Sequence, residues 1–324
     1  MKPFVSIVVP TFRRPPLLAR CLHALVKQEL PFHPFEIIVV DDGNDAATRE
    51  VVETIARQTT VAVRYLAQPQ RRGPAAARNR GWREARGVII GFTDDDCLPE
   101  PHWIRHAVDA FIDGAEVVSG RLVVPCSEKP TDYERVAALL ETAEFVTANC
   151  FCTKTALEQV GGLDERFDIA WREDSDLHFK FIEHTIPITS RKDVTVVHPV
   201  REAVWWACLK DERKNRYDAL LYKRHPQLFR ERIPTYPNLV LMYYAVVIGF
   251  LLGVGGLVAE LPYVASYGFG LFSAFLLVLI GRRLWGTRLT VAAVWQTVVT
   301  TAATPFLSVY WRLYGAFKYR TLYW

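Results

Sequence analysis

The segment Val88–Asp96, with the sequence VIIGFTDDD, ends an apolar run in three adjacent carboxylates. The apolar residues have the composition of a short buried strand, so the acidic side chains are expected where that strand ends. Three neighbouring carboxylates repel one another unless water solvates them or a cation binds them. Hard divalent cations such as Mg²⁺ and Mn²⁺ prefer oxygen ligands and often keep positions open for phosphate groups. The segment therefore predicts either a metal-binding strand end or a solvated acidic turn.

Strand-like and helix-like segments alternate along the first 200 residues. The expected strands cover residues 5–10, 35–40, 61–66 and 88–90, and the expected helices cover 16–30, 48–58 and 78–86. Such alternation is typical of an α/β fold, in which helices cover both faces of a parallel sheet. Ligands bind these sheets beyond the carboxyl ends of the strands. Pro10-Thr11, Asp41-Asp42 and Asp94–Asp96 are all expected at that edge, which predicts a site there.

Two familiar nucleotide-binding patterns are missing from the sequence. No Gly-x-Gly-x-x-Gly follows the first expected strand, and no Gly-Lys-Ser/Thr phosphate loop occurs. Carboxylates at strand ends can still bind a nucleotide, because they accept hydrogen bonds from ribose hydroxyls or a base N–H while a metal neutralises the diphosphate. The sequence therefore disfavours a dinucleotide or P-loop fold, but it allows a nucleotide ligand.

The net charge of +4 is unevenly distributed along the chain. Residues 236–324 hold six of the 39 Lys and Arg residues but one of the 35 acidic residues, so residues 1–235 are nearly neutral. A nucleic-acid binder would carry its basic excess on the folded domain, and we therefore expect no nucleic-acid partner. The six cysteines show no metal-binding spacing and are expected as free thiols in a reducing cytosol. No secretory signal is expected at the N-terminus.

The C-terminal region is apolar enough to enter a membrane. Residues 238–259 and 263–281 contain no charged side chain, and each is long enough to cross a hydrocarbon core of about 30 Å. The short break between them predicts a helical hairpin, with a buried soluble helical domain as the alternative. Arg282, Arg283 and Arg288 follow the second helix, so the positive-inside rule places this end, and with it the α/β domain, in the cytoplasm.

A third apolar segment covers residues 289–311 and contains Gln296 and Pro305. If it crossed the membrane, the basic residues that follow it would lie outside, against the positive-inside rule. We therefore expect a helix that lies in the interface or re-enters on the cytoplasmic side, with a spanning helix as the alternative. The expected organisation is an α/β domain over residues 1–235 and a membrane region over residues 236–324.

Seven motifs follow one another in the α/β region. They are Val5–Arg14 (VSIVVPTFRR), Glu36–Gly43 (EIIVVDDG), Gly73 with Ala77–Gly81 (ARNRG), Phe92–Asp96 (FTDDD), Ala148–Phe151 (ANCF), Gly161–Phe167 (GGLDERF) and Glu173–Leu177 (EDSDL). This ordered series, over residues 4–225, resembles glycosyltransferase family 2. The resemblance implies an inverting, nucleotide-sugar-dependent enzyme of the membrane-anchored bacterial type. It also implies a GT-A catalytic domain, built on a Rossmann-like, mixed and mostly parallel sheet.

The resemblance assigns a donor pocket to the first two strand ends. Pro10, Thr11 and Arg13 would line the nucleotide pocket. Asp41 and Asp42 would hold the base and the ribose. These roles are carried over from the family by position in the motifs.

The resemblance also assigns roles around the acidic run. Arg78 would lie near the donor and support the run, while Asp94 and Asp95 would contact ribose, sugar or metal. Asp96 would bind the metal, with Asp95 as an alternative ligand, and Mg²⁺ or Mn²⁺ is the implied cofactor. His198 ends another apolar strand, where a lone histidine is more often structural. Some GT-A enzymes use a histidine there as a metal or diphosphate contact, so His198 is a further candidate ligand.

Glu173 and Asp174 precede an amphipathic helical segment over residues 177–181. Carboxylates at a helix N-terminus interact favourably with the helix dipole and its free N–H groups, which is the structural explanation for the pair. The resemblance implies instead that Asp174 is the general base, which takes the proton of an acceptor hydroxyl. Glu173 and Trp171 would then lie on the acceptor side.

The predicted function is hexosyl transfer of one sugar from a nucleotide-diphosphate sugar to a hydroxyl of a lipid or lipid-linked glycan. This reaction would serve cell-envelope or exopolysaccharide synthesis at the inner membrane, with the catalytic domain in the cytoplasm. The sequence lacks the Gln-x-x-Arg-Trp pattern of processive synthases, which favours single transfer, and no protein partner is predicted. The alternatives are a polyprenyl-phosphate glycosyl transferase and a non-catalytic nucleotide-sugar-binding membrane scaffold. A nucleotidyltransferase would require a glycine-rich phosphate loop that is missing.

Overall fold

A computed structural model describes residues 3–30, 33–201, 204–287 and 289–323, so Arg288 lies outside the described residues. The chain forms two compact units. Unit 1 comprises residues 1–125 and 137–200, and unit 2 comprises residues 126–136 and 201–324. The division at residue 235 between a catalytic domain and a membrane region stays a prediction.

Unit 1 contains an eight-stranded sheet with the strand order β3-β2-β1-β4-β7-β6-β8-β5. The pairs β1–β2, β1–β4, β2–β3 and β6–β8 are parallel, whereas β4–β7, β6–β7 and β5–β8 are antiparallel. This mixed, mostly parallel sheet confirms the predicted fold class. The strands are β1 (Val5–Thr11), β2 (Phe35–Asp41), β3 (Ala62–Ala67), β4 (Ile89–Thr93), β5 (Leu98–Pro99), β6 (Val117–Val123), β7 (Asn149–Thr153) and β8 (Ile188–Val197).

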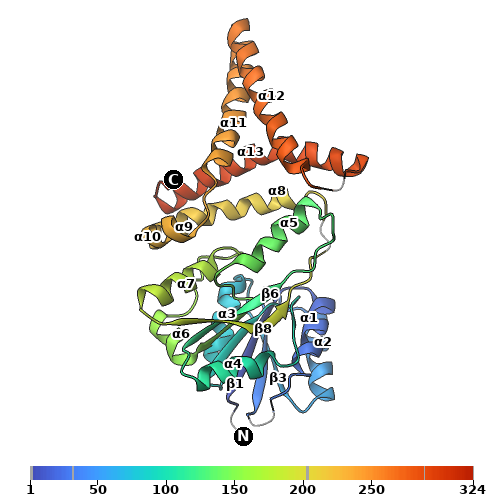
Figure 1. Cartoon of the computed structure of the whole chain (residues 1–324), viewed down its shortest axis with the longest axis vertical. Helices are drawn as coiled ribbons and strands as arrows, with labels where there is room; N and C mark the ends of the chain where they lie inside the picture. Colours follow the sequence, from blue (N-terminus) through green and yellow to red (C-terminus); the bar gives the residue numbers. More distant parts are fainter. Residues whose placement is uncertain (1–2, 31–32, 202–203, 288, 324) are drawn as a thin grey trace. The chain divides into compact units, whose positions relative to one another are not determined.

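Helices cover both faces of this sheet, as Figure 1 shows. Successive side chains of a strand point to opposite faces, so Ile7 of β1 joins the core beneath α1, α2 and α4, while Val8 joins the core beneath α3, α6 and α7. Both cores consist almost entirely of aliphatic and aromatic side chains. The helices of this unit are α1 (Pro15–Leu25), α2 (Ala46–Gln58), α3 (Pro74–Glu84), α4 (Trp103–Ile112), the 3₁₀ helix η1 (Leu139–Thr142), α6 (Lys154–Val160) and α7 (Glu173–Glu183).

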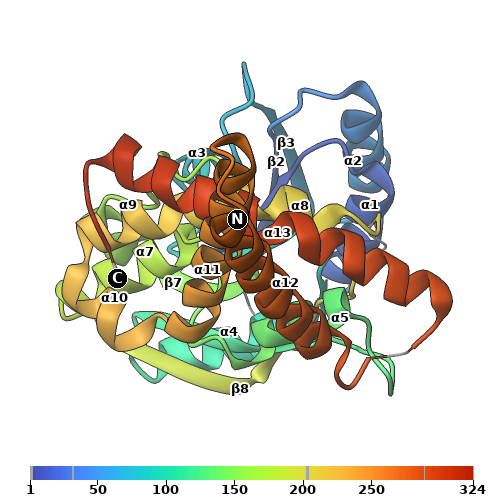
Figure 2. The same ribbon diagram turned by 90° about the horizontal axis from the view of Figure 1, so that it is seen from above.

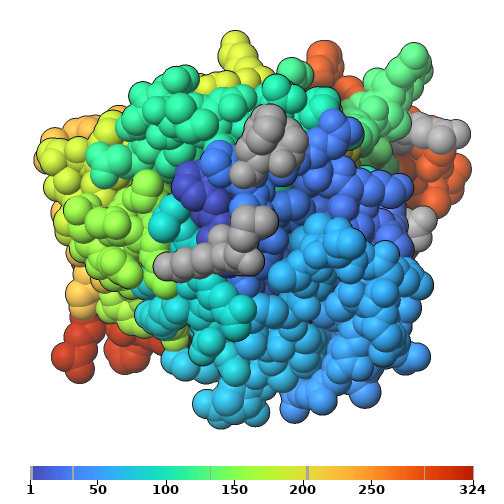
Figure 3. Space-filling view, turned by 90° about the horizontal axis from the view of Figure 1, so that it is seen from below, coloured from blue at the N-terminus to red at the C-terminus, as the bar shows by residue number. Residues whose placement is uncertain are grey.

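The predicted site residues lie at one edge of the sheet. Because β1, β2 and β4 are parallel, their carboxyl ends at Thr11, Asp41 and Thr93 fall on the same side. Figure 3 views the opposite edge, where the strands begin and N-terminal segments, coloured blue to cyan, cover much of the surface.

Helix α3 begins at Pro74, earlier than the predicted 78–86 helix. Gly73, before it, has a φ of 89°, and a Cβ there would lie 2.4 Å from the carbonyl oxygen of Asp168. Glycine is therefore required by both the backbone conformation and the close approach. Pro74 has the φ that a first helical turn needs and no N–H to leave unsatisfied. The Gly73-Pro74 pair thus fixes where α3, the helix that carries Arg78, begins.

Asn79 on α3 anchors the segment that leads toward α7. Its Nδ2 donates to the carbonyl oxygen of Leu163 at 2.8 Å, and its Oδ1 accepts the N–H of Leu163 at 2.9 Å. Nδ2 also donates to Glu165 at 2.9 Å. A Cβ on Gly162 would lie 2.6 Å from Asn79 Oδ1, so no side chain fits there. The ARNRG and GGLDERF motifs therefore meet through a paired amide contact.

The described residues of unit 2 are helical or irregular. The helices α11 and α12, of 22 and 23 residues, are long and apolar enough to cross a membrane. They pack closely, since a Cβ on Gly268 would lie 2.3 Å from the backbone nitrogen of Gly253, and small residues allow such an approach between apolar helices. The helices are α5 (Asp132–Ala138), whose last two residues belong to unit 1, α8 (Ala207–Asp211), the 3₁₀ helix η2 (Glu212–Asn215), α9 (Arg216–Arg224), α10 (Pro226–Arg232), α11 (Pro237–Val258), α12 (Pro262–Leu284) and α13 (Val291–Tyr319).

Helix α13 extends beyond the predicted 289–311 segment and runs across the base of the α11–α12 hairpin in both Figure 1 and Figure 2. One side of α13 packs on η2 and α9, where Asn215 donates to the hydroxyl of Ser308 at 3.1 Å. Another side carries exposed apolar and aromatic side chains at helical spacing, among them Tyr310, Leu313 and Phe317. The helix is therefore amphipathic over its C-terminal half.

Candidate active site

The acidic run follows β4 directly, and residues of the segment around the end of β1 hold its middle carboxylate. Thr11 donates its hydroxyl to Asp95 Oδ2 at 2.8 Å, and Arg14 Nη1 lies 3.3 Å from Asp95 Oδ1. Burial raises the pKa of Asp95 above the usual aspartate value, and the charges of Asp96 and Asp94 add to this rise while Arg14 opposes it. The ends of β1 and β4 are thus tied together through one buried carboxyl group.

Arg14 is a site residue that the family motifs do not single out. The predicted residue, Arg13, has a φ of 52° and places its guanidinium over the ring of Phe12, 5.5 Å from the centroid. The ion pair with Asp95 is made by Arg14 instead. The two arginines are adjacent, and no spacing rule predicts the left-handed backbone that decides which of them reaches the acidic run.

Asp41 is fully buried at the end of β2 and accepts three hydrogen bonds. Its Oδ1 accepts the N–H of Gly43 at 2.8 Å, and its Oδ2 accepts the N–H of Asp45 at 2.7 Å and the hydroxyl of Tyr65 at 2.8 Å. These contacts shape the turn after β2. A direct contact between Asp41 and a nucleotide base stays a prediction.

Asp42 holds the loop that follows β3. Its two carboxylate oxygens accept the N–H groups of Arg72 and Gly73 at 2.7 and 2.8 Å. The neighbouring Arg71 lies with its guanidinium 4.5 Å from the centroid of the Phe12 ring. The loops after β1 and β3 therefore meet over the strand ends, where the predicted nucleotide pocket would lie. Contact of Asp42 with the ribose stays a prediction.

Arg78 connects the donor side with the acceptor side of the predicted site. Its Nη2 lies 2.6 Å from Asp94 Oδ1 and its Nη1 lies 3.1 Å from Glu173 Oε1, while the side chain is 2% exposed. Burial alone would lower the pKa of Arg78, but the charges of Asp94 and Glu173 outweigh burial and raise it. The guanidinium is therefore a permanent cation shared by two carboxylates that are distant in the sequence.

The predicted general base lies at the first turn of α7, next to this bridge. Burial, together with the charge of Asp174, raises the pKa of Glu173 to about 7 against the opposing charge of Arg78. Burial also raises the pKa of Asp174, whose Oδ1 accepts the N–H of Ser175 at 2.7 Å. Trp171 is partly exposed, and the guanidinium of Arg172 lies 4.9 Å from its ring centroid.

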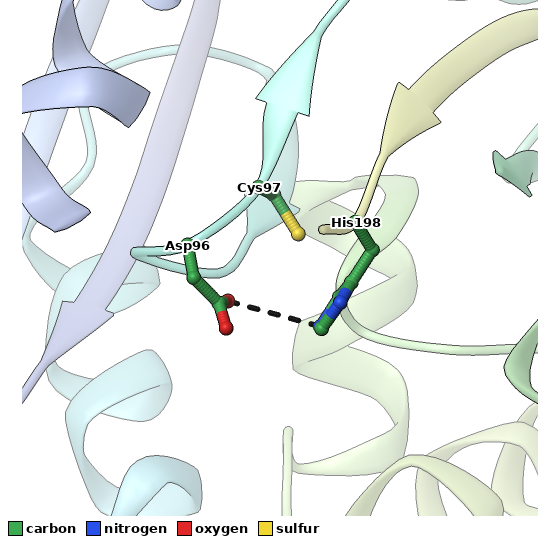
Figure 4. A group of neighbouring side chains, drawn as sticks. All are labelled: Asp96, Cys97 and His198. Carbon is green, nitrogen blue, oxygen red and sulfur yellow. Dashed lines mark ion pairs between the residues drawn. The ribbon is translucent and has the colours of Figure 1, made fainter. Parts of the chain in front are cut away.

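Asp96, Cys97 and His198 come together where β5 begins and β8 ends (Figure 4). Asp96 Oδ1 lies 3.7 Å from His198 Nε2. His198 Nδ1 is buried and has no hydrogen-bond partner among the described residues. A carboxylate oxygen and an imidazole nitrogen at this spacing, with further carboxylates beside them, fit a divalent cation. The predicted metal residues Asp96 and His198 are therefore brought together, whereas Asp95 is held by Thr11 and Arg14.

Apart from Trp171, which lies just before α7, the predicted residues fall into two groups. The first group lies at the strand ends and in their loops. It consists of Arg13, the pair Asp41-Asp42, and Pro10, which is buried in β1 opposite Val40. A second group forms one ionic cluster around Arg78 and the acidic run; its members are Thr11, Arg78, Asp94, Asp95, Asp96, Glu173, Asp174 and His198. Such a cluster can bind a cation and take up a proton, which are the two requirements for transfer to a hydroxyl group.

Comparison with known proteins identifies the family of this domain. Residues 6–160 match the family model described as glycosyl transferase family 2. The chain therefore contains a glycosyl transferase family 2 domain within residues 6–160. This match and the glycosyltransferase relatives confirm that the chain is a glycosyltransferase, as the motif series implies.

Several relatives are similar over parts of their length. Glycosyltransferase AglE of Haloferax volcanii is 27% identical over 216 residues, which are 61% of this chain and 68% of AglE. The GalNAc(5)-diNAcBac-PP-undecaprenol beta-1,3-glucosyltransferase of Campylobacter jejuni is 34% identical over 94 residues, 29% of this chain and 30% of that enzyme. The chain spans between 15% and 68% of the length of these and other curated relatives.

A solved structure shares the fold. The mannosyltransferase PcManGT from Pyrobaculum calidifontis, in complex with GDP-Man and Mn²⁺, superposes with a TM-score of 0.58 at 20% identity. The superposition covers 97% of this chain and 88% of PcManGT. The GT-A arrangement predicted from the motifs is therefore confirmed.

Replacing Arg78 with methionine is expected to destabilise the protein and abolish transfer. The change leaves Glu173 and Asp94 without their shared cation, and breaking a buried ion pair costs about 3–5 kcal/mol. Thermal unfolding of detergent-purified protein would show a midpoint lowered by several degrees. Arg83→Met is the matched control, because Arg83 lies on the same helix, its side chain is 53% exposed, and an exposed ion pair such as Arg83–Glu165 contributes less than about 1 kcal/mol. Equal midpoints for the two variants would contradict a structural role for the bridge.

Glu173 is expected to make stability fall as pH rises. Its pKa is raised from the usual 4.5 to about 7, so the folded state holds this proton more tightly than the unfolded state does. The stability that the proton contributes is fully present below pH 4.5 and is lost as pH rises through about 7. Unfolding midpoints across this range should fall more steeply for the natural protein than for Glu173→Gln, which cannot titrate. Identical slopes would show that Glu173 has an ordinary pKa.

Proposed function

We propose that the chain is an inverting glycosyltransferase that moves one sugar from a nucleotide-diphosphate sugar to a hydroxyl of a lipid or lipid-linked glycan. The observation that carries this proposal is the bridge from Asp94 through Arg78 to Glu173. The proposed base Asp174 follows Glu173 directly and feels the charges of Arg78 and Asp94, which supports a single ionic cluster of donor-side acids and base. Such a cluster suits direct transfer, because the leaving group and the incoming hydroxyl must meet in a fixed geometry.

Asp174 is the group that we assign as general base. An acceptor hydroxyl is a weak nucleophile until a positioned carboxylate takes its proton. The raised pKa of Asp174, caused mainly by burial, makes it a stronger base than an exposed aspartate. The acceptor oxygen forms a bond to the anomeric carbon while the bond from that carbon to the diphosphate breaks. In-line attack inverts the anomeric centre, so an α-linked donor gives a β-linked product without a covalent enzyme intermediate.

Asp96 and His198 are the proposed ligands of a divalent cation, with Asp95 as the alternative carboxylate. A bound Mg²⁺ or Mn²⁺ would offset the charge that develops on the departing diphosphate. Arg14 and Arg78 meanwhile hold Asp95 and Asp94 in fixed positions, which reduces the reorganisation needed when the donor binds. PcManGT, solved with GDP-Man and Mn²⁺, supports this donor class and a metal.

The acceptor class is proposed from the apolar C-terminal helices and from one relative. A chain anchored in a membrane keeps its active site within reach of membrane lipids. The Campylobacter relative is named for an undecaprenol-linked acceptor, which supports a lipid-linked glycan and a role in cell-envelope or exopolysaccharide synthesis.

Nucleotide-diphosphate release by detergent-purified protein tests this function. UDP-, GDP- and dTDP-sugars would each be assayed with Mg²⁺ or Mn²⁺, with EDTA, and with native lipid extract as the acceptor source. We expect release from one donor, dependent on the metal and reduced by about 10²–10⁴-fold in Asp174→Asn, because a general base contributes that much. Asp113→Asn removes an exposed carboxyl group from the same unit and should leave activity unchanged.

Each result of this assay separates the alternatives. Nearly full activity of Asp174→Asn would favour a phosphate acceptor, which needs no base, and hence a polyprenyl-phosphate glycosyl transferase. Binding of one donor without turnover in native lipid extract would favour a scaffold. No binding of any donor would overturn the proposed function.

We also propose that α11 and α12 span the inner membrane and that unit 1 lies in the cytoplasm. Both helices pass the length and hydropathy requirements for a span, and Arg282 and Arg283 end the second one. The amphipathic α13 would then lie in the interface, with its exposed aromatic side chains in the headgroup region.

Cysteine labelling in spheroplasts tests this topology. Cys126 is exposed and Cys208 is half-buried, so the background replaces both with serine and keeps the four buried cysteines. One cysteine at a time is then introduced at the exposed positions Glu50, Glu260 and Arg320. A membrane-impermeant maleimide should label Glu260→Cys, at the hairpin turn, from outside. Glu50→Cys and Arg320→Cys should react only after lysis. Outside labelling of Arg320→Cys would show that α13 spans, and outside labelling of Glu50→Cys would reverse the orientation.

A further inference from the structure

Cys97 lies beside the two side chains that we assign to the metal. A carboxylate oxygen of Asp96, the Sγ of Cys97 and an imidazole nitrogen of His198 all lie within 4.8 Å of one another. Figure 4 shows the three side chains facing a common space. Cys97 has no exposed surface, and the His198 and Asp96 side chains are 13% and 2% exposed. The three groups therefore form a compact cluster of mixed ligands with little exposure to water.

This ligand set differs from the one that Mg²⁺ or Mn²⁺ prefers. Hard cations take oxygen ligands, whereas thiolate and imidazole suit zinc. Zinc commonly binds three protein ligands and leaves a fourth position open, with bonds of roughly 2.0–2.3 Å. Ligands of one zinc ion then lie roughly 3–4 Å apart. The Asp96–His198 distance of 3.7 Å already falls in this range, and Cys97 is within the reach of a small side-chain adjustment.

We propose that Asp96, Cys97 and His198 form a zinc-binding site that overlaps the donor-metal site, so that Zn²⁺ excludes Mg²⁺ or Mn²⁺ and inhibits transfer. Zinc binding replaces the hydrogen of the thiol, and the released proton passes to the solvent without any change of oxidation state. The aspartate and the thiolate together cancel the charge of the ion. The neutral site can no longer offset the charge of a departing diphosphate, which is the physical reason for inhibition. Inhibition rests on the proposed function, whereas zinc binding does not.

Cobalt(II) is the probe for the sulfur ligand, because it occupies zinc sites and absorbs strongly in the near ultraviolet when a thiolate binds it. The full chain, purified in detergent and freed of metal, would be titrated with CoCl₂. We expect a sulfur-to-cobalt band that Zn²⁺ abolishes and that Cys97→Ser and Cys97→Ala lack. Cys21→Ser is the matched control, because Cys21 is equally buried and donates its thiol to the carbonyl oxygen of Asp94 at 3.4 Å. It should keep the band.

Two results would overturn the zinc site: cobalt binding without a sulfur band, or a band that persists in Cys97→Ser. In assays with Mn²⁺, Zn²⁺ should inhibit the natural protein at concentrations at least about tenfold lower than those needed for Cys97→Ser, since a thiolate is the ligand that zinc gains. Equal sensitivity of the two proteins would contradict the inhibition. Failure of every donor to react in the absence of zinc would count against the proposed function instead and would leave the cobalt result as it stands.

Discussion

A guanidinium that is almost excluded from water holds the two sides of the site together. Arg78 is 2% exposed, and such a cation is tolerated only when carboxylates compensate its lost hydration. Asp94 and Glu173 provide that compensation from opposite sides of the site. The fold must therefore deliver the end of β4 and the start of α7 to the same helix, α3. The Gly73-Pro74 start of α3 and the contacts of Asn79 serve this requirement.

The first half of the sheet was predictable because its pattern is local. Apolar runs and helical spacing locate β1, β2, β3 and β4, and their parallel order places three polar clusters at one edge. The second half was not. Strand β7 enters between β4 and β6 and runs antiparallel to both, and the direction of that pairing depends on contacts that no short window of sequence contains.

The residue types of the site could be predicted from the sequence, but the ion pairs and hydrogen bonds between them could not. The resemblance assigns Arg78 and Glu173 to the site, yet the ion pair between them joins positions 95 residues apart. An aspartate at position 41 is compatible with two roles, binding a ligand or holding its own loop, and the sequence does not distinguish them. In the structure its carboxylate accepts three hydrogen bonds, two from the loop and one from Tyr65. Arg14 takes its place on Asp95 because of a left-handed backbone at Arg13. Local patterns of residue type predict neither the backbone conformation of a single residue nor ion pairs between residues far apart in the sequence.

The Asp42 carboxylate holds the loop after β3 through two backbone N–H groups, and this affects which substitutions the loop can tolerate. A clamp on backbone N–H groups does not depend on which side chains the clamped residues carry. Arg71 and Arg72 can therefore be exchanged for other residues while the loop keeps its path, provided that Gly73 is kept. Substitutions at these two positions can therefore change the charge and size of the loop beside Phe12 with little effect on folding. Under the proposed function, preference for a particular nucleotide would therefore be open to drift or to engineering without a redesign of the sheet beneath this loop.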